Sequence, residues 1–315
     1  MGESEAAVAF RIGTRGSPLA LAQAVETRER MAQAHGLEHA AFALDVIKTT
    51  GDAVLDRALS ELGGKGLFTK EIDEALLGGR IDLAVHSMKD VPTVLPEGMV
   101  LAAILPREDV RDAFISPRAA NLDALPPGAL VGTASLRRQA QVLRRRPDLR
   151  VETFRGNVQT RLRKLEAGEA DATFLAMAGL SRLGMTEVIT APVETEMMLP
   201  AVAQGAIGIA CRADDTRVID ALAPLNDPIT ATRVTAERAF LRRLDGSCRT
   251  PLAGLARLDG QGGLTLSGEI LTPDGRECHA DTLAGGEADA VTLGEQLGEM
   301  LLSRAGPDFL IAHSG

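Results

Sequence analysis

Apolar side chains occupy every second position of residues 81–86, a pattern that predicts a strand with one face buried. A Val-Pro step follows at 91–92, and because a residue before proline is pushed towards extended geometry, no helix can follow directly. Ser87, Lys89 and Asp90 are thereby left at the carboxyl end of a strand, where open α/β sheets bind their ligands. Taken alone, the Lys-Asp pair is more typical of an ordinary solvated loop, and only the further motifs described below favour a ligand site.

The segments before this strand alternate between strand and helix patterns. Ser17 is a good N-cap and Pro18 a good first helical residue, so a helix is predicted to run to about Ala34. Strands are predicted at 7–12, 42–48 and 81–86, and helices at 18–34 and 68–78. This alternation is typical of a largely parallel sheet. The glycine cluster at 63–66 lacks the spacing of a P-loop.

A weak internal repeat relates the first part of the chain to the second. The run at 12–17 resembles that at 131–135, and the run at 79–82 matches that at 168–171 at a constant offset of 89 residues. Strands are predicted at 130–133, 149–154 and 171–176, with helices capped by Ser135 and Asn157; the first of these helices is expected to bury Leu136, Ala140 and Leu143. Two lobes of one architecture are expected, with a cleft between them as the default place for a ligand.

The last third of the chain has a different pattern. The apolar run at 206–211 is predicted to return the chain to the first lobe. A helix at 231–244 and a loop at 245–251 then precede alternating segments over 252–283, with Asp-Gly turn signals at 259–260 and 274–275. A closing helix is predicted at 288–304. These elements predict a small α+β domain.

Charge is unevenly distributed along the chain. Residues 133–165 hold nine arginines and one lysine against two acidic residues, which gives this segment a net charge of +8. Since the whole chain has a net charge of −9, the rest of the chain carries −17. A basic island in an acidic protein favours an anionic ligand, although a solvated basic helix face is a common alternative. A nucleic-acid surface is disfavoured because Phe154 is the island's only aromatic residue and the chain has no Trp or Tyr.

Composition excludes several other classes. The first residues have no basic region followed by an apolar run, so no secretory signal is expected. No stretch reaches the roughly 18 apolar residues of a membrane span. Three widely spaced cysteines and five scattered histidines form neither a disulfide framework nor a metal site. We therefore expect a cytoplasmic protein with no structural metal.

Arginines stand at predicted helix starts in three places. A cation is disfavoured there by roughly 0.3–1 kcal/mol because the helix end already carries partial positive charge. An anion bound by backbone N–H groups and guanidinium groups together would explain the pattern. The three places are Arg137 and Arg138 after Ser135, Arg15 before Ser17, and Arg155 before Gly156 and Asn157. Their recurrence favours a polyanionic ligand.

The three cysteines differ in their surroundings. Cys211 lies in an apolar run and is predicted to be a buried hydrophobe. Cys278 follows a turn signal and is given no role. Cys248 lies in a glycine-containing loop beside Arg249, where a positive neighbour favours the thiolate, but the residues alone leave a reactive role open. No His or Asn partner is identifiable, which disfavours a protease-like nucleophile.

Several of these runs together resemble porphobilinogen deaminase, also called hydroxymethylbilane synthase. The matching runs are TRGSPLA (14–20), GGKGLF (63–68), VHSMKDVP (85–92), GTASLRRQ (132–139), RGNVQTR (155–161), LPAVAQG (199–205) and RVTAER (233–238). The resemblance extends in order from about residue 10 to the final helix. Two departures are small: Gly16 stands where glutamine is frequent, and Ser247 stands where a second glycine is common before the cysteine.

The resemblance implies a transferase that links four porphobilinogens head to tail, with loss of ammonia, and then releases hydroxymethylbilane by hydrolysis. It implies a dipyrromethane cofactor, thioether-linked to Cys248, and a catalytic carboxylate at Asp90. It implies that the acetate and propionate groups are bound by residues around these two. That set is Arg15, Ser17, Lys65, Ser87, Lys89, Thr133, Ser135, Arg137, Arg138, Arg155, Asn157, Arg161, Arg182 and Gln204.

The fold implied is α/β, with two periplasmic-binding-protein-like lobes of mixed, mainly parallel sheets and a small C-terminal α+β domain. The expected domains are residues 1–106 with 204–224, residues 107–203, and residues 225–315 carrying Cys248. A monomer that binds porphobilinogen, and neither nucleic acid nor membrane, is expected. The rival class is a binding module, such as a solute-binding or effector-sensing domain. Absence of an export signal, and of a helix-turn-helix before the first strand, argues against it.

Overall fold

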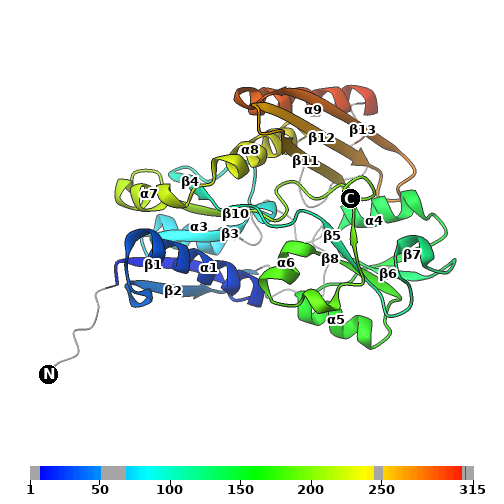
Figure 1. Cartoon of the computed structure of the whole chain (residues 1–315), viewed down its shortest axis with the longest axis horizontal. Helices are drawn as coiled ribbons and strands as arrows, with labels where there is room; N and C mark the ends of the chain where they lie inside the picture. The colour runs from blue at the N-terminus through cyan, green and yellow to red at the C-terminus, as the bar shows by residue number, and fades with distance from the viewer. Residues whose placement is uncertain (1–7, 51–68, 245–250, 307–308, 310–315) are drawn as a thin grey trace. The chain divides into compact units, whose positions relative to one another are not determined.

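The computed structural model describes residues 8–50, 69–244, 251–306 and 309 (Figure 1). The described residues divide into two compact units, one of residues 8–50, 69–107 and 206–231, the other of residues 108–205, 232–244, 251–306 and 309. Each unit contains a five-stranded sheet of mixed direction, and the second also contains a three-stranded antiparallel sheet. The predicted α/β class with a small C-terminal α+β domain is confirmed, whereas the three predicted domain limits stay a prediction.

The sheet of the first unit has the strand order β2-β1-β3-β10-β4. Strands β2, β1 and β3 are parallel, and β10 lies antiparallel between β3 and β4. The predicted return of the chain through an apolar strand is therefore confirmed. The elements are β1 (Phe10–Arg15), α1 (Pro18–His35), β2 (Phe42–Ile47), α3 (Lys70–Leu77), β3 (Leu83–Ser87), β4 (Met99–Ile104), β10 (Ile207–Arg212) and α7 (Thr216–Leu222), with short 3-10 turns η1 (His39–Ala41), η2 (Met88–Asp90) and η5 (Ala223–Leu225).

Two local predictions in this unit need correction. The strand predicted at 7–12 is β1, which runs on to Arg15 because its parallel pairing with β2 continues to Ile47. The strand predicted to bury one face, β3, is buried on both, and even His86 is only 6% exposed. Since β3 lies in the middle of the sheet, both of its faces are covered, which alternation alone does not reveal.

The cap residues of α1 are those expected from the sequence. Ser17 is the N-cap, and its side chain accepts a hydrogen bond from the backbone N–H of Ala20. Gly36 ends the helix in the left-handed conformation, at φ 62°, which glycine adopts without steric cost. The predicted helix is confirmed: it begins at Pro18 as expected and ends at His35, one residue later than predicted.

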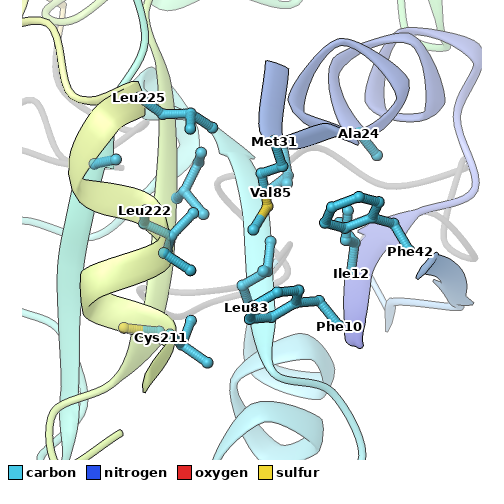
Figure 2. Close-up of a cluster of buried hydrophobic side chains, with 14 of the residues drawn as sticks. Phe10, Ile12, Ala24, Met31, Phe42, Leu83, Val85, Cys211, Leu222 and Leu225 are labelled. Atoms are coloured by element: carbon cyan, nitrogen blue, oxygen red, sulfur yellow. The ribbon is translucent and has the colours of Figure 1, made fainter. Parts of the chain in front are cut away.

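A hydrophobic cluster fixes β1 and β3 at the centre of the first unit (Figure 2). The rings of Phe10 and Phe42 stack with centroids 5.8 Å apart. Met31 of α1 and Leu222 of α7 are fully buried in the same cluster. Cys211 also lies in it and is 0% exposed, so its prediction as a buried hydrophobe is confirmed.

The five-stranded sheet of the second unit has the order β7-β6-β8-β5-β9. Here β6 lies between β7 and β8, and the antiparallel strand β5 borders β8. In the first unit, β1 likewise lies between β2 and β3, and the antiparallel strand β10 borders β3. The predicted repeat of one architecture is confirmed. The elements are β5 (Asp112–Ile115), η3 (Leu122–Ala124), β6 (Leu130–Gly132), α4 (Leu136–Arg145), β7 (Arg150–Glu152), α5 (Val158–Glu166), β8 (Ala172–Ala176), α6 (Met177–Arg182), η4 (Thr186–Val188) and β9 (Ala191–Val193).

The C-terminal sheet has the order β11-β12-β13 and is contacted by α9 (Figure 1). The predicted turns at 259–260 and 274–275 are confirmed, since they lie between consecutive antiparallel strands. These elements are α8 (Pro228–Arg243), β11 (Leu252–Leu258), β12 (Gly263–Leu271), β13 (Cys278–Gly286), η6 (Glu287–Asp289) and α9 (Ala290–Ala305). In the described part of the chain, no helix is both long and apolar enough to cross a bilayer.

The core face predicted for α4 is partly wrong. Ala140 is buried, but Leu136 and Leu143 are only half-buried. The buried positions include Arg137, Arg138 and Gln141 instead. Helix α4 is rotated in this way because a buried carboxylate beneath it binds both arginines, as described below.

Candidate functional site

Asp90 lies in the turn η2 directly after β3, at the edge of the first sheet where β1 also ends. Arg15 is the last residue of β1, and its Nη1 lies 3.6 Å from Asp90 Oδ2. The two side chains are 20% and 32% exposed, so the pair is sheltered but open to solvent. Because β1 and β3 are parallel neighbours, their carboxyl ends bring a cation and a carboxylate together. The strand pattern had predicted the position of Asp90 but not its pairing with Arg15.

A hydrogen bond from α1 supports this edge. The Ser87 hydroxyl lies 2.9 Å from Gln23 Nε2 and 3.0 Å from Gln23 Oε1. Gln23 is 4% exposed, so the buried amide holds the serine at the end of β3. Gln23 was not among the predicted site residues, although a polar residue between the apolar Ala22 and Ala24 of a predicted helix was a usable signal. Lys89, in contrast, is exposed.

His86 precedes this turn and is buried in β3. Burial, together with the positive charge of Arg15, lowers the pKa of His86 to about 4. The imidazole is therefore neutral near pH 7.

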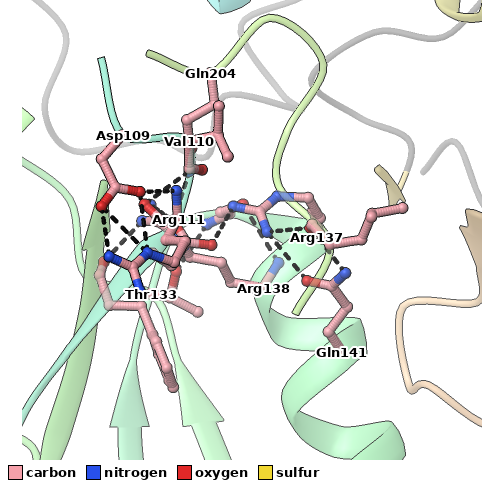
Figure 3. A network of polar contacts seen from close by, with 12 residues as sticks. Asp109, Val110, Arg111, Thr133, Arg137, Arg138, Gln141 and Gln204 are labelled. Atoms are coloured by element: carbon pink, nitrogen blue, oxygen red, sulfur yellow. Dashed lines mark hydrogen bonds and ion pairs between the residues drawn. The ribbon is translucent and has the colours of Figure 1, made fainter. Parts of the chain in front are cut away.

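In the second unit, Asp112 binds both arginines of α4. Arg137 and Arg138 are labelled in Figure 3. Arg137 Nη2 lies 2.8 Å from one carboxylate oxygen and Arg138 Nη2 lies 2.7 Å from the other. Asp112 is 0% exposed, and each arginine side chain is 5% exposed. Burial by itself raises the pKa of Asp112, but the charges and hydrogen bonds of the two guanidinium groups outweigh it and hold the pKa below its usual range.

Backbone carbonyls hold the arginine pair as well. Arg138 Nη1 donates to the Phe174 carbonyl at 2.7 Å, and Arg137 Nη1 donates to the Leu199 carbonyl at 2.8 Å. Ser135 caps the helix by accepting from the N–H of Arg138 at 3.4 Å, and the Thr133 hydroxyl, 2% exposed, accepts from the N–H of Ser135. The predicted cap is confirmed. The arginine side chains fold back into the lobe rather than standing on its surface.

Gln204 belongs to the same network. Its Nε2 lies 3.0 Å from Asp112 Oδ1 and 2.8 Å from the Val110 carbonyl, and the residue is 1% exposed (Figure 3). Next to it, both terminal nitrogens of Arg182 lie 3.2 Å from the Gly205 carbonyl. Gln204 and Arg182 therefore both hydrogen-bond to other groups of the protein. Whether they also bind a ligand, as predicted, stays a prediction.

The third predicted arginine site lies at the start of α5. Asn157 is the N-cap, accepting from the N–H and hydroxyl of Thr160 at 2.9 and 3.0 Å, and Arg161 Nε donates to the Gly156 carbonyl at 2.9 Å. Gly156 has φ 114°, and a Cβ there would lie 2.6 Å from the Thr160 side chain. Glycine is therefore required by the backbone itself, whatever approaches it.

Around α4 and the start of α5, three buried N–H groups have no acceptor among the described residues. They are Nε of Arg137, Nε of Arg138 and Nη1 of Arg155. Buried donors are nearly always hydrogen-bonded, so these groups call for an acceptor from elsewhere. A carboxylate accepts from several guanidinium N–H groups at once, and it is the ligand group that such donors fit.

Two predicted site residues, Lys65 and Cys248, lie outside the described residues. Among the described ones, Arg15, Ser17, Ser87 and Asp90 gather at one edge of the first sheet. A second group gathers around α4 and α5 of the second unit. Asp112 was missed because an isolated acidic residue at a strand start carries no distinguishing sequence pattern. Its role depends on two arginines that only the fold brings to it.

Structural comparison finds a periplasmic substrate-binding protein of an ABC transporter from Coxiella burnetii, with a TM-score of 0.43 and 14% identity over 73% of this chain and 96% of the other. A methionine-binding protein, MetQ, is similar with a TM-score of 0.44 and 14% identity, covering 69% of this chain and 89% of that protein.

Sequence comparison is more specific. The family model "Porphobilinogen deaminase, dipyromethane cofactor binding domain" matches residues 10–220, and the model "Porphobilinogen deaminase, C-terminal domain" matches residues 231–303. A porphobilinogen deaminase of Paracoccus denitrificans is 62% identical over 300 residues, 95% of this chain and 96% of that protein. A chloroplastic porphobilinogen deaminase of Pisum sativum is 57% identical over 305 residues, 95% of this chain and 83% of that protein. The chain belongs to the porphobilinogen deaminase family.

Proposed function

We propose that Asp90 is the catalytic carboxylate of this chain and that Cys248 carries its dipyrromethane cofactor. The reaction is that of a transferase: four porphobilinogen molecules are linked head to tail with loss of ammonia, and hydroxymethylbilane is released by hydrolysis. The observation that carries the assignment of Asp90 is its ion pair with Arg15 at the carboxyl edge of a sheet.

The arginines of the second unit fit the cofactor. When bound, the dipyrromethane supplies the covalent primer to which porphobilinogen units are added. Its acetate and propionate groups are acceptors of the kind that Nε of Arg137, Nε of Arg138 and Nη1 of Arg155 lack among the described residues. A bound carboxylate would turn three unsatisfied donors into charge-assisted hydrogen bonds.

Asp90 can stabilise positive charge and move a proton. Loss of ammonia from porphobilinogen leaves an electron-poor, cationic pyrrole, and a fixed negative charge beside the ring lowers the free energy of that state. The Asp90 carboxylate is held by Arg15 rather than buried, so its oxygens remain able to accept and return a proton. Attachment through Cys248 would keep the growing chain beside this carboxylate and make successive additions local reactions.

The remaining predicted residues would bind substrate and cofactor carboxylates. They divide between the two units, and each unit supplies cations and hydroxyl groups of its own. The proposed set is Arg15, Ser17, Ser87 and Lys89 from the first, and Thr133, Ser135, Arg137, Arg138, Arg155, Asn157, Arg161, Arg182 and Gln204 from the second, together with Lys65, which lies outside the described residues.

We also propose that the chain acts as a monomer in the cytoplasm and binds neither nucleic acid nor membrane. The thiols of Cys211 and Cys278 are free, which suits a reducing compartment. A net charge of −9 opposes association with nucleic acid. Sedimentation of the purified chain at two concentrations tests the monomer, and a concentration-dependent increase in mass would overturn it.

The intact mass of the purified protein under denaturing conditions tests the assignment of Cys248. A mass above that of the chain by two porphobilinogens less two ammonias is expected, and it should disappear in Cys248→Ser. Matched controls are Cys211→Ser and Cys278→Ser, which should keep the adduct. An adduct that persists in Cys248→Ser would overturn the placement. A chain that stays unmodified even after porphobilinogen is added would favour a binding module.

A further inference from the structure

Glu269 of the C-terminal sheet is hydrogen-bonded to helix α4. It lies in β12, and its Oε1 accepts a hydrogen bond from Nε2 of Gln141. Gln141 lies one helical turn after Arg137 and is 7% exposed. The small C-terminal sheet therefore contacts, through one amide, the helix that carries the arginine pair.

The Gln141 amide has a fixed orientation. Its Oε1 accepts from Arg137 Nη1 at 3.1 Å, and its Nε2 donates to the Leu199 carbonyl at 3.0 Å as well as to Glu269. An amide has one accepting and one donating end, and a carboxylate only accepts. Glu269 and the Leu199 carbonyl therefore hold Nε2 on their side, which leaves Oε1 to face Arg137.

Glu269 also acts on Arg137 through its charge. Burial lowers the pKa of Arg137, and the charges of Asp112 and Glu269 oppose that lowering. Burial raises the pKa of Glu269, against the hydrogen bond from Gln141 and the charges of Arg137 and Arg144. Asp112 supplies one negative charge to two buried guanidinium groups, and the charge of Glu269 adds to it at Arg137.

The surroundings of Glu269 are polar. Together with Gln141 and Arg144 it borders a hollow of about 640 Å³ between α4 and strands β12 and β13. Glu269 therefore contributes a polar contact here rather than hydrophobic packing. Its described side-chain hydrogen-bond partner is Gln141.

We propose that Gln141 and Glu269 are positioning residues that orient Arg137 for a carboxylate of the cofactor. This inference rests on the proposed function, in which Arg137 Nε donates to that carboxylate. With Nη1 and Nη2 bound to Gln141, Leu199 and Asp112, the guanidinium plane is fixed and its Nε–H points to one place. Arg137 is then pre-organised before the ligand arrives, which reduces the ordering cost of binding.

The experiment follows cofactor acquisition by the full-length chain isolated without cofactor. Porphobilinogen is added, and the increase in intact mass is measured against time. Glu269→Ala removes the acceptor and Gln141→Met removes the amide at similar size. Each is expected to slow acquisition by about 3- to 10-fold, the effect of losing one hydrogen bond. Glu269→Gln keeps an acceptor without the charge and should recover to within about threefold of the unsubstituted chain.

The double variant separates positioning from general damage. If both residues act through Arg137, Glu269→Ala with Gln141→Met is no slower than the slower single variant, whereas independent defects multiply. Glu295→Ala is the matched control, because Glu295 is an exposed glutamate of α9 paired only with Arg242 among the described residues, and it should leave acquisition unchanged. Should Glu269→Ala fail to fold, Gln141→Met decides by itself, and acquisition at the normal rate in that variant would overturn the inference.

Two outcomes overturn the inference: acquisition at the normal rate in both Glu269→Ala and Gln141→Met, or defects that multiply in the double variant. Failure of the unsubstituted chain to acquire the adduct would instead overturn the proposed function. The two failures are therefore distinguishable in one series of measurements.

Discussion

Asp112 and Arg137, 25 residues apart in the sequence, form an ion pair of 2.8 Å in which the carboxylate is completely buried and the guanidinium is 5% exposed. The same carboxylate binds Arg138 at 2.7 Å. A buried ion pair of this kind is costly to break, because the partner that remains is an uncompensated charge without water.

Replacement of Asp112 by Asn should therefore destabilise the protein strongly. We expect the free energy of unfolding to fall by about 3–5 kcal/mol, since two buried guanidinium groups lose their shared charge partner. Asp123→Asn is the control: Asp123 pairs with Arg145 where both side chains are more than 40% exposed, and its loss should cost below about 1 kcal/mol. Urea denaturation measures both, and equal losses would contradict the prediction.

Replacement of Asp90 by Asn should abolish most turnover and leave the fold intact. The amide keeps the shape of the carboxylate but not the charge that stabilises a cationic pyrrole, so porphobilinogen consumption should fall by at least about 100-fold. The unfolding transition should stay nearly unchanged, because the Arg15–Asp90 pair is partly exposed and such pairs contribute about 0–1 kcal/mol. Asp45→Asn, which breaks the surface pair with Arg80, should keep full activity. Near-normal turnover by Asp90→Asn would refute the catalytic role.

Arg155→Lys should weaken ligand binding without weakening the fold. Arg155 Nη1 is buried with no acceptor among the described residues, so its loss removes no hydrogen bond there. Lysine keeps the charge but lacks the planar set of donors that a carboxylate accepts. The specificity constant kcat/KM for porphobilinogen should fall by about 10- to 100-fold, as expected for one charge-assisted hydrogen bond. Arg150→Lys, which contacts the Gly128 carbonyl on the exposed face, is the control and should be indistinguishable from the original chain.

The buried His86 should make stability depend on pH. Its pKa is lowered from 6.5 to about 4 in the folded protein, so between these values the unfolded chain binds a proton that the folded one does not, and stability falls as pH falls. When the pH is lowered from 7.5 to 5, the original chain should lose about 2 kcal/mol more of its unfolding free energy than His86→Gln does. Asp73, whose pKa is raised to about 6, acts in the opposite sense but is common to both proteins. A pH-independent difference in urea midpoints would contradict the prediction.

Local patterns located most elements of the fold. Ser17, Ser135 and Asn157 were predicted as N-caps, and each accepts the hydrogen bond expected of a cap. Caps and turns are contacts between residues a few positions apart, so a sequence carries them in full. The resemblance to a known family rested on short sequence motifs, such as residues 85–92 and 132–139, and it is confirmed by the family models.

Burial was less predictable than position. His86 occupies what alternation marks as the polar face of β3, yet the face is covered because β3 is central in its sheet. On α4, two arginines and Gln141 are buried in place of Leu136 and Leu143. Periodicity describes one element at a time and contains no information about what packs against it.

The sequence by itself determined the alternation of strands and helices, the caps, the return strand and the residue types gathered near Asp90 and along α4. Only the tertiary structure decided that Asp112 would bind Arg137 and Arg138, that Gln23 would hold Ser87, and that Glu269 would reach Gln141. The physical reason is one of range. Propensities, caps and turns are set by neighbours in the chain, whereas a buried charge has a stable place only where distant segments bring its partner to it.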